Sequence, residues 1–408
     1  MAELDIKPIA VEEHFWRPSE ASGASRSERA KQTGTYHSAI PAELANSRLH
    51  FTTDLAADIE DGTRALIEFD VYARSRLGVE NPALGPMSAI LLRTESSSSS
   101  NIEELTTGAK QLALAEIGET TKQNARAVIG NVRAMEAALR LSESLNTDTV
   151  LAMHAELMAG QTGAEQIAGR LREELVWVGG SRQGPLSSAY VAPQADRLAS
   201  ALNDLFLFAD RDDIPVLAQV ALAHAQFETI HPFADGNGRT GRALAQAMLR
   251  NKGLVRHTTV PLSAGLLRDI EPYFDSLTAF RAGDGGPVVR QFAEAARFAS
   301  VSGRKLVESL HTQLQESRAK LSHLRADAAA WDVLPRLIAQ PVVNVRYLSQ
   351  QLDMNDKTAQ RAMRQLAETG VLIERSGRDR RRVWQHEGIL EVLDDYAASI
   401  RRDGGRTG

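Results

Sequence analysis

The chain has no cysteine among its 408 residues. Disulfide bonds are therefore excluded, and nothing in the sequence calls for an oxidising compartment. No apolar run approaches the roughly eighteen residues that a membrane-spanning helix needs. The first residues, Met-Ala-Glu-Leu-Asp-Ile-Lys, do not have the pattern of a signal peptide. We expect a cytoplasmic protein with no membrane partner.

Aromatic residues and net charge are also low, at 5% and −5. A chain without a strong basic excess is not built to coat nucleic acid along its length, although a balanced total can hide local basic patches. Apolar residues make up 43% and charged residues 24% of the chain, as in soluble globular proteins. The length exceeds what one small core needs, so two or three domains are expected.

The most informative stretch is His231–Arg242, which reads His-Pro-Phe-Ala-Asp-Gly-Asn-Gly-Arg-Thr-Gly-Arg. Pro232 disfavours helical backbone at the residue before it, so the preceding helix ends here. A new helix is predicted from about Gly238 to Lys252, and Gly253 is a typical residue after a helix end. The turn that opens this helix is therefore rich in glycine.

Such a turn favours an anion. The first N–H groups of a helix have no partner within the helix, and glycine lets a ligand approach them closely. Arg239 and Arg242 are three residues apart, so their side chains share one side of the first helical turn. The sequence therefore predicts an anion site with His231 as a candidate base beside it.

The stretch resembles the motif of the Fic family, His-Pro-Phe-x-(Asp/Glu)-Gly-Asn-Gly-Arg-x-x-Arg, at every fixed position. Most members of this family transfer AMP from ATP to a Ser, Thr or Tyr hydroxyl of a target protein. The resemblance implies a catalytic base at His231, a Mg²⁺ ligand at Asp235, and a phosphate site made by Gly236, Asn237, Gly238, Arg239 and Arg242. In this comparison Arg242 binds the γ-phosphate. ATP, Mg²⁺ and a hydroxyl-bearing protein, with self-modification as one option, are the implied partners.

A serine run, Ser96–Ser100, precedes a second resemblance. Low-complexity serine is typical of a flexible linker. However, Ser99-Ser100-Asn101-Ile102-Glu103 resembles the inhibitory motif of many Fic proteins, (Ser/Thr)-x-x-x-Glu-(Gly/Asn). The resemblance implies that Glu103, on a helix, pairs with Arg242 and displaces the γ-phosphate. Glu104 departs from the motif. The alternative is a solvent-exposed glutamate at a helix start.

Between the two motifs, Val176–Gly180 is a short β-prone run that glycines end, and Ser181–Pro193 is rich in turn residues. We interpret the segment as a β-hairpin. The resemblance implies a flap that pairs with the backbone of the target. The alternative is an ordinary surface hairpin.

Two further interpretations concern single side chains. His224 and Glu228 lie one turn apart on the expected helix Ile214–Ile230, a spacing found in metal sites. Because no third ligand is evident, we interpret them as a pair in or at the edge of the core. Tyr273 lies where family members place an aromatic ring near the nucleotide base.

The C-terminal part has a different pattern. Short helices are expected at Trp331–Ile338 and Val345–Leu352, and Asn355 or Asp356 caps a third, followed by two strands around a basic turn. This order is typical of a winged helix-turn-helix. The candidate DNA-binding residues are Lys357, Arg361 and Arg364 on the third helix and Arg380 and Arg381 in the turn. A solvated basic face and a protein-binding module remain the alternatives.

The expected fold is mainly α: an all-helical Fic core with a short β-hairpin flap, and a C-terminal winged helix. Its expected parts are an irregular arm (1–45), a helical region with the inhibitory motif (46–105), the core (106–300), a connecting helix (301–328) and the winged helix (329–400). Within 46–105 we expect helices at Thr53–Leu77 and Pro86–Leu92, the second ending before the serines.

Three functions remain open. The first is an autoinhibited protein adenylyltransferase. The second is a DNA-binding regulator whose Fic domain only senses nucleotide. The third is a related enzyme that removes AMP or transfers another group. The resemblance also suggests a homodimer.

Overall fold

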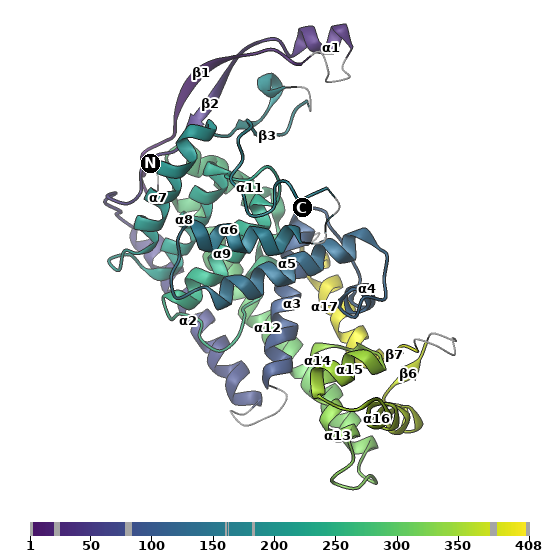
Figure 1. Cartoon of the computed structure of the whole chain (residues 1–408). Coiled ribbons are helices and arrows are strands. Elements are labelled where there is room, and N and C mark those ends of the chain that lie inside the picture. The colour runs from purple at the N-terminus through teal and green to yellow at the C-terminus, as the bar shows by residue number, and fades with distance from the viewer. Residues whose placement is uncertain are drawn as a thin grey trace. The chain divides into compact units, whose positions relative to one another are not determined.

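The computed structural model describes residues 3–19, 25–77, 84–159, 161, 163–181, 184–375 and 382–404. It divides into two compact units, each discontinuous in sequence. Unit 1 comprises Met1–Thr63, Arg133–Gly253 and Ile270–Glu294, and unit 2 comprises Arg64–Val132, Leu254–Asp269 and Ala295–Gly408. The chain is mainly helical, as expected (Figure 1).

Unit 1 is a helical bundle around α8 (Val216–Ile230), which packs against α7, α9 and α11. Every residue of α8 from Leu217 to Ile230 is buried, because apolar residues lie nearly all round the helix. The other helices of the unit are α1 (Arg26–Lys31), α6 (Thr147–Met158), α7 (Leu198–Ala209), α9 (Asn237–Asn251) and α11 (Ile270–Arg281). Helices α2 (Thr53–Leu77), α5 (Gln123–Arg140) and α12 (Gly286–Lys320) have residues in both units.

The expectation of an irregular arm at residues 1–45 is wrong. Strands β1 (Ala10–Trp16) and β2 (Gly34–Ile40) form an antiparallel hairpin, with Ala10 opposite Ile40 and Trp16 opposite Gly34. Contacts distant in sequence hold the hairpin, since the Trp16 ring meets the Trp177 ring edge-on with centroids 5.4 Å apart. The local composition does not reveal these partners.

The hairpin expected between the motifs is confirmed. Strands β3 (Trp177–Val178) and β4 (Tyr190–Val191) pair antiparallel, and the connection includes a 3₁₀ turn at Pro185–Ser187. Strand β4 also contacts β2.

Unit 2 is built on α3 (Leu84–Ile102), which packs against α10 (Leu262–Arg268) and α14. The expected end of this helix before the serines is wrong. The hydroxyls of Ser96 and Ser100 donate to carbonyls one turn earlier, at 2.9 Å, and the Asn131 amide donates to the Ser96 carbonyl at 2.8 Å. Four serines of the run are buried (Ser96, Ser98, Ser99 and Ser100), so packing maintains the helix where composition suggested a linker.

Two buried carboxylates hold the segment around α10. Asp70 accepts hydrogen bonds from the backbone N–H groups of Arg256, His257 and Thr258. Glu95 of α3 accepts from the N–H and the hydroxyl of Ser263, at 2.8 and 2.6 Å. The Glu95 bonds satisfy a backbone donor in the first turn of α10, and the Asp70 bonds satisfy donors in the segment before it.

The C-terminal part of unit 2 has helices followed by two strands, as expected, but the expected helix Trp331–Ile338 is divided into two and β5 is an additional strand. A three-stranded sheet, ordered β5-β7-β6, accompanies the helices. The elements are α13 (Ala330–Val333), α14 (Arg336–Ala339), β5 (Val342–Val343), α15 (Val345–Leu352), α16 (Asp356–Glu368), β6 (Ile373–Glu374), β7 (Trp384–Gln385) and α17 (Glu387–Gly404). The remaining helix, α4 (Ala109–Glu116), packs against α17 and β5.

The expected connecting helix at 301–328 is not a separate element. Its residues up to Lys320 continue α12, which begins at Gly286 in unit 1. Gly303 lies within this helix. A Cβ at this position would lie 2.6 Å from the Phe69 ring. The position needs a small residue for close packing.

Candidate functional site

The loop between α8 and α9 begins at His231, which follows the last residue of α8. His231 has left-handed backbone angles, φ 50° and ψ 60°, and its N–H donates to the carbonyl of Phe227. Pro232 explains why the helix cannot continue. The loop ends at Gly236, also left-handed with φ 78°, directly before α9. A Cβ at Gly236 would lie 2.8 Å from Leu157, so glycine is required there for space as well.

Asn237 closes the loop. Its side-chain carbonyl accepts from the N–H of Phe233 and its amide donates to the carbonyl of Phe233, both at 2.8 Å. The side chain is 4% exposed. It therefore stabilises the loop, and the backbone N–H groups of Asn237 and Gly238 are the better candidates for anion contacts.

The first turn of α9 carries both arginines of the motif. Arg239 and Arg242 are each 3% exposed. A buried guanidinium at a helix N-terminus adds a full charge to the partial positive charge of the helix dipole. The geometry thus gives an electropositive helix start of the kind that binds phosphate.

Asp235 lies beside this helix start with its side chain 63% exposed. One carboxylate oxygen accepts from the N–H of Gly236 at 2.7 Å, and the same oxygen lies 3.6 Å from the Arg239 guanidinium. An exposed carboxylate next to a phosphate site suits Mg²⁺, which takes one or two protein carboxylates and completes its shell with phosphate and water. Among the described residues no three His, Asp or Glu side chains come together as a metal site.

The protonation state of His231 suits a general base. Its Nδ1 lies 3.3 Å from the carbonyl of Glu228, which can only accept, so Nδ1 carries the proton and Nε2 keeps a lone pair. Burial lowers the pKa of His231 to about 4, against the opposing effect of the hydrogen bond to Glu228. The side chain is 17% exposed, which leaves a narrow access. The imidazole is therefore neutral at pH 7.

His154 of α6 supports the loop and was not recognised from the sequence. Its ring stacks on Phe233 with centroids 3.8 Å apart and an angle of 8°. Its Nδ1 accepts from the N–H of Gly169 at 3.1 Å, so its Nε2 donates to the carbonyl of Asp235 at 3.0 Å. Burial lowers the pKa of His154 to about 4. The neutral ring thus holds the middle of the motif in place.

Arg172 supports the loop from the other side and was also missed. Its guanidinium donates to the carbonyls of His231 at 2.8 Å, Glu174 at 3.0 Å and Pro193 at 2.7 Å. The residue is 5% exposed, and burial lowers its pKa to about 10. Arg172 therefore ties the candidate base to the segment that follows the β3–β4 hairpin.

The hairpin itself is anchored by Tyr190 of β4. The Tyr190 hydroxyl donates to the carbonyl of Thr229 in α8, and the Arg281 guanidinium lies 3.8 Å from the centre of the Tyr190 ring. Burial raises the pKa of the Tyr190 hydroxyl. The hairpin is thus fixed to the helix that ends at His231.

His224 and Glu228 are both buried, as the interpretation of a pair in or at the edge of the core predicts. His224 is buried and its Nε2 lies 2.8 Å from the Tyr273 hydroxyl. Tyr273 is only 1% exposed, so the placement near a nucleotide base is wrong and the ring belongs to the core. The Cβ position of Gly241 lies 3.2 Å from Glu228, so close helix packing fills the space there.

The residues of the inhibitory resemblance belong to unit 2, while the motif belongs to unit 1. Ser99 is fully buried in α3. Helix α3 ends at Ile102, so Glu103 is the first residue after it and is half-buried. Glu104 has φ 63°, the left-handed conformation that favours glycine and asparagine.

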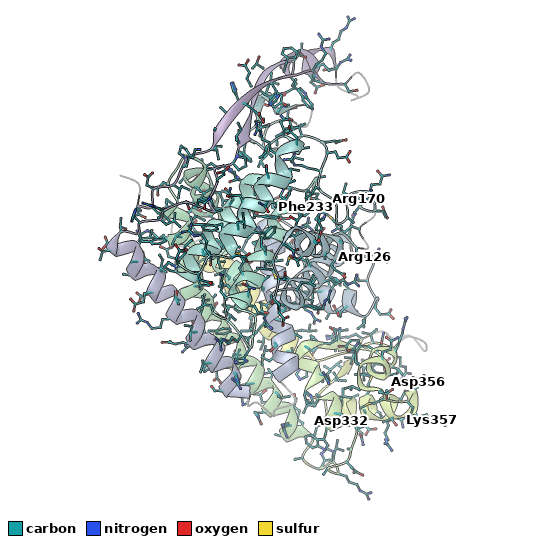
Figure 2. All side chains as sticks on the ribbon, turned by 60° about the vertical axis from the view of Figure 1, so that its left-hand side comes forward. Arg126, Arg170, Phe233, Asp332, Asp356 and Lys357 are labelled. Atoms are coloured by element: carbon teal, nitrogen blue, oxygen red, sulfur yellow. The ribbon has the colours of Figure 1, made fainter. Side chains whose placement is uncertain are left out.

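The candidate DNA-binding residues Lys357, Arg361 and Arg364 are exposed on α16. Figure 2 shows Lys357 at the start of this helix, beside Asp356. Of the two expected caps, Asn355 is the N-cap, and it accepts from the N–H of Thr358 at 2.9 Å. Arg380 and Arg381 lie outside the described residues.

The fold and the loop define a helical protein with a candidate anion site beside a neutral histidine. Residues 144–249 match the model of the Fic/DOC family. Protein adenylyltransferase fic-1 of Caenorhabditis elegans is 31% identical over 172 residues, which are 40% of this chain and 31% of that protein. Protein adenylyltransferase Fic of Nematostella vectensis is 30% identical over 155 residues, 37% of this chain and 32% of that protein.

Among solved structures, a Fic family protein from Desulfovibrio desulfuricans G20 matches with a TM-score of 0.51 and 22% identity, over 83% of this chain and 97% of that one. This similarity concerns the fold. The chain spans about a third of the length of the two curated relatives. Residues 144–249 of the chain are therefore similar to the Fic domain. No helix in its described part is long and apolar enough to cross a membrane.

Proposed function

We propose that the protein transfers AMP from ATP to a hydroxyl side chain of a target protein. The observation that carries the proposal is the pairing of His231, neutral and with an available Nε2, with the electropositive start of α9 in one loop. The match to the Fic/DOC model and the names of the two relatives support the same activity.

In the proposed reaction the target hydroxyl attacks the α-phosphorus, its proton passes to His231 Nε2, and the bond to the β-phosphate breaks to release pyrophosphate. A neutral base with a fixed tautomer suits this proton transfer. The N–H groups of Asn237 and Gly238 and the guanidinium groups of Arg239 and Arg242 stabilise the phosphate charge. Positioning and charge neutralisation provide most of the catalysis in such transfers.

Asp235 is the residue that would hold Mg²⁺. Its exposed carboxylate fits the ion, which would neutralise the polyphosphate when bound.

We further propose that Glu103 restrains this activity by competing with the γ-phosphate for Arg242. A carboxylate can form two parallel hydrogen bonds with a guanidinium, and so can a phosphate, so the two exclude each other. The motif resemblance and the place of Glu103 directly after a buried helix support the proposal.

Labelling with α-³²P-ATP tests both statements. The Glu103→Gly protein should label a target or itself more strongly than the original chain. Adding His231→Ala to it should reduce labelling by about 10²–10⁴-fold, the usual contribution of a positioned acid–base group. Label from γ-³²P-ATP should not transfer. If Glu103→Gly labels no protein in a lysate, AMP transfer is not the activity.

DNA binding by the C-terminal part is a second candidate function. It is favoured by the row of exposed cations on α16, a helix expected to enter the major groove. A salt-dependent gel shift with genomic fragments tests it. Changing Arg361 and Arg364 to Ala should reduce the salt slope by about 2, since each phosphate contact contributes about 0.9. Arg325→Ala, an exposed arginine before α13, is the matched control. A slope equal in both variants argues for a protein partner instead.

A further inference from the structure

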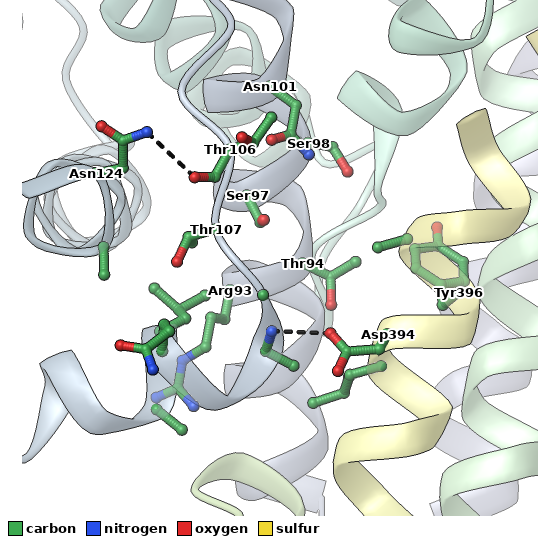
Figure 3. A pocket seen from close by; sticks show the side chains of 18 of the residues that line it. Arg93, Thr94, Ser97, Ser98, Asn101, Thr106, Thr107, Asn124, Asp394 and Tyr396 are labelled. Carbon is green, nitrogen blue, oxygen red and sulfur yellow. Dashed lines mark hydrogen bonds between the residues drawn. The ribbon is translucent and has the colours of Figure 1, made fainter. Parts of the chain in front are cut away.

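A cavity of about 600 Å³ lies within unit 2 (Figure 3), whereas the His231–Arg242 motif belongs to unit 1. Its walls are α3, the segment from Thr106 to the start of α4, the first turn of α5, and α17. The volume falls within the range of about 300–1,000 Å³ that is usual for small-molecule sites.

One face of α3 forms a wall. Arg93, Thr94, Ser97, Ser98 and Asn101 all line the cavity, and their spacing of three and four residues places them on one side of the helix. The same helix ends directly before Glu103. A ligand in the cavity would therefore contact the helix that leads directly into the proposed inhibitory residue.

The facing walls come from two other regions. Helix α17 contributes Asp394 and Tyr396, which Figure 3 shows across the cavity from Asn124 of α5. The Asp394 carboxylate accepts from the N–H of Ala109 at 2.9 Å, and the Asn124 amide donates to the carbonyl of Thr106 at 3.3 Å. These bonds hold the segment after Glu104 against α5 and α17.

Two buried polar atoms on the lining side chains have no hydrogen-bond partner within the described part of the chain. They are Nε of Arg93, a donor, and Oδ1 of Asn101, an acceptor. Arg93 is 8% exposed. Buried polar groups without partners are uncommon, and a ligand with hydroxyl groups could both accept from the first and donate to the second.

The lining also restricts the charge of the ligand. The cations are Arg93, already 3.7 Å from Glu116, and Lys122, and they are balanced in part by Asp394. A polyphosphate does not match this balance. Hydroxyl and amide side chains alternate with an apolar floor made by Leu112, Leu267, Leu393 and Ile400. Such a lining suits a small molecule with several hydroxyls and one apolar ring face.

We propose that this cavity is an effector site for an uncharged, hydroxyl-rich small molecule of nucleoside or hexose size, and that its occupancy strengthens inhibition by Glu103. The regulatory half rests on the proposed function. A ligand that bridges Asn101 and Thr106 ties together the two sides of the Glu103–Leu105 turn. The turn then opens less often, and Glu103 releases Arg242 less often.

Binding is tested with the full chain by thermal shift, using adenosine, uridine and glucose as probes. A probe at ten times its Kd should raise the Tm by about 3 °C. A shift with the nucleosides alone or with glucose alone identifies the source of the hydroxyls. If none of the three probes shifts the Tm at millimolar concentration, the proposal is overturned.

Variants locate the binding. Ala397→Trp on α17 fills the cavity and should abolish the shift, whereas Ser399→Trp, exposed on the same helix and outside the lining, should retain it. If Ala397→Trp does not fold, the exposed pair Lys122→Ala and Asn124→Ala should reduce affinity at least tenfold. A shift that persists in both cavity variants but disappears in Arg242→Ala places the probe in the ATP site and overturns the proposal.

The effect of the ligand on inhibition is measured separately from binding, by labelling with α-³²P-ATP. A saturating probe should reduce α-³²P labelling by the original chain several-fold and leave Glu103→Gly unchanged. Equal reduction in both proteins overturns the link to Glu103. Absence of labelling in Glu103→Gly is a failure of the proposed AMP transfer, and the thermal shift then still decides whether the site exists.

Discussion

Two helix ends in this protein carry candidate functional residues, and they are built differently. The loop from His231 to the start of α9 is held by His154, Arg172 and Asn237, all buried. The turn after α3 contains a half-buried Glu103 and an exposed Glu104 in a left-handed conformation. In the first, the residue with left-handed backbone angles before the helix is Gly236. In the second, the residue with left-handed backbone angles after the helix is Glu104.

The difference suggests a division of roles. A catalytic group needs its position fixed before substrate arrives, because small displacements cost large factors in rate. An inhibitory residue that must release its partner needs a turn whose open and closed conformations differ in free energy by only a few kcal/mol. We therefore expect damage at the first site to be severe and changes at the second to be graded.

The largest expected difference comes from acid. Burial lowers the pKa of His154 and His231 to about 4 and of His224 to about 3, all in unit 1, whereas unit 2 has only His386, with a pKa of about 4, among its described histidines with lowered values. Protonation therefore favours the unfolded chain. Stability that is complete above about pH 6.5 is lost as pH falls toward 4.

Between pH 7 and pH 5 each such histidine should remove about 2 kcal/mol. Hydrogen exchange at the two pH values measures it, with peptides from α8 and α9 for unit 1 and from α15 and α16 for unit 2. Protection should fall further in unit 1. Equal loss in both units would contradict the concentration of neutral buried histidines in unit 1.

Arg172→Ala should produce the largest effect of a single change. It removes the donors to the carbonyls of His231, Glu174 and Pro193 together. We expect a loss of about 3 kcal/mol in unfolding free energy and at least a 100-fold loss of labelling in the Glu103→Gly background. Urea denaturation and α-³²P labelling measure the two.

Arg170→Ala is the control, because Arg170 is an exposed arginine two residues away (Figure 2). It should change neither quantity. Full labelling by a folded Arg172→Ala protein would show that the loop holds His231 without it.

His154→Phe should have a smaller effect. Phenylalanine keeps the stacking on Phe233 but cannot bond to the Gly169 N–H or the Asp235 carbonyl. Each buried group left without a partner costs about 1–3 kcal/mol. We expect kcat to fall more than KM rises, because the change displaces the loop and removes no contact with the target.

His50→Phe, at an exposed histidine of the same unit, should leave both kinetic constants unchanged. A His154→Phe protein with lower stability but the original kcat would limit His154 to folding.

The sequence predicted the motif loop well because its signals are local. Pro232 and the glycines around Asn237 determine the backbone of residues directly beside them. The cap at Asn355 of α16 was predictable for the same reason. It did not predict the roles of His154 and Arg172, which lie 77 and 59 residues before His231 and act through hydrogen bonds to backbone carbonyls. A histidine in an apolar helix and an arginine in a mixed segment carry no local mark of such partners. The prediction that the helix ends before the serines failed for the same reason. The helix continues because the serines pack against Asn131, which is distant in sequence.

The smallest effect is expected at Glu104, and it tests the proposed control most directly. A non-glycine residue in the left-handed region costs about 1–2 kcal/mol, and asparagine tolerates that region better. Glu104→Asn should therefore stabilise the turn by about 0.5–1 kcal/mol without loss of packing, because Glu104 is exposed. Labelling by the otherwise original chain should fall about threefold, in proportion to that free energy.

Gly118, left-handed with φ 73° after α4 in the same unit, gives the opposite control. Gly118→Ala should destabilise unit 2 by about 1 kcal/mol and leave the Glu103 turn unaffected. If Glu104→Asn increased labelling, the side chain of Glu104 itself would be the restraint. The left-handed turn would then serve to present Glu104 and not to hold Glu103.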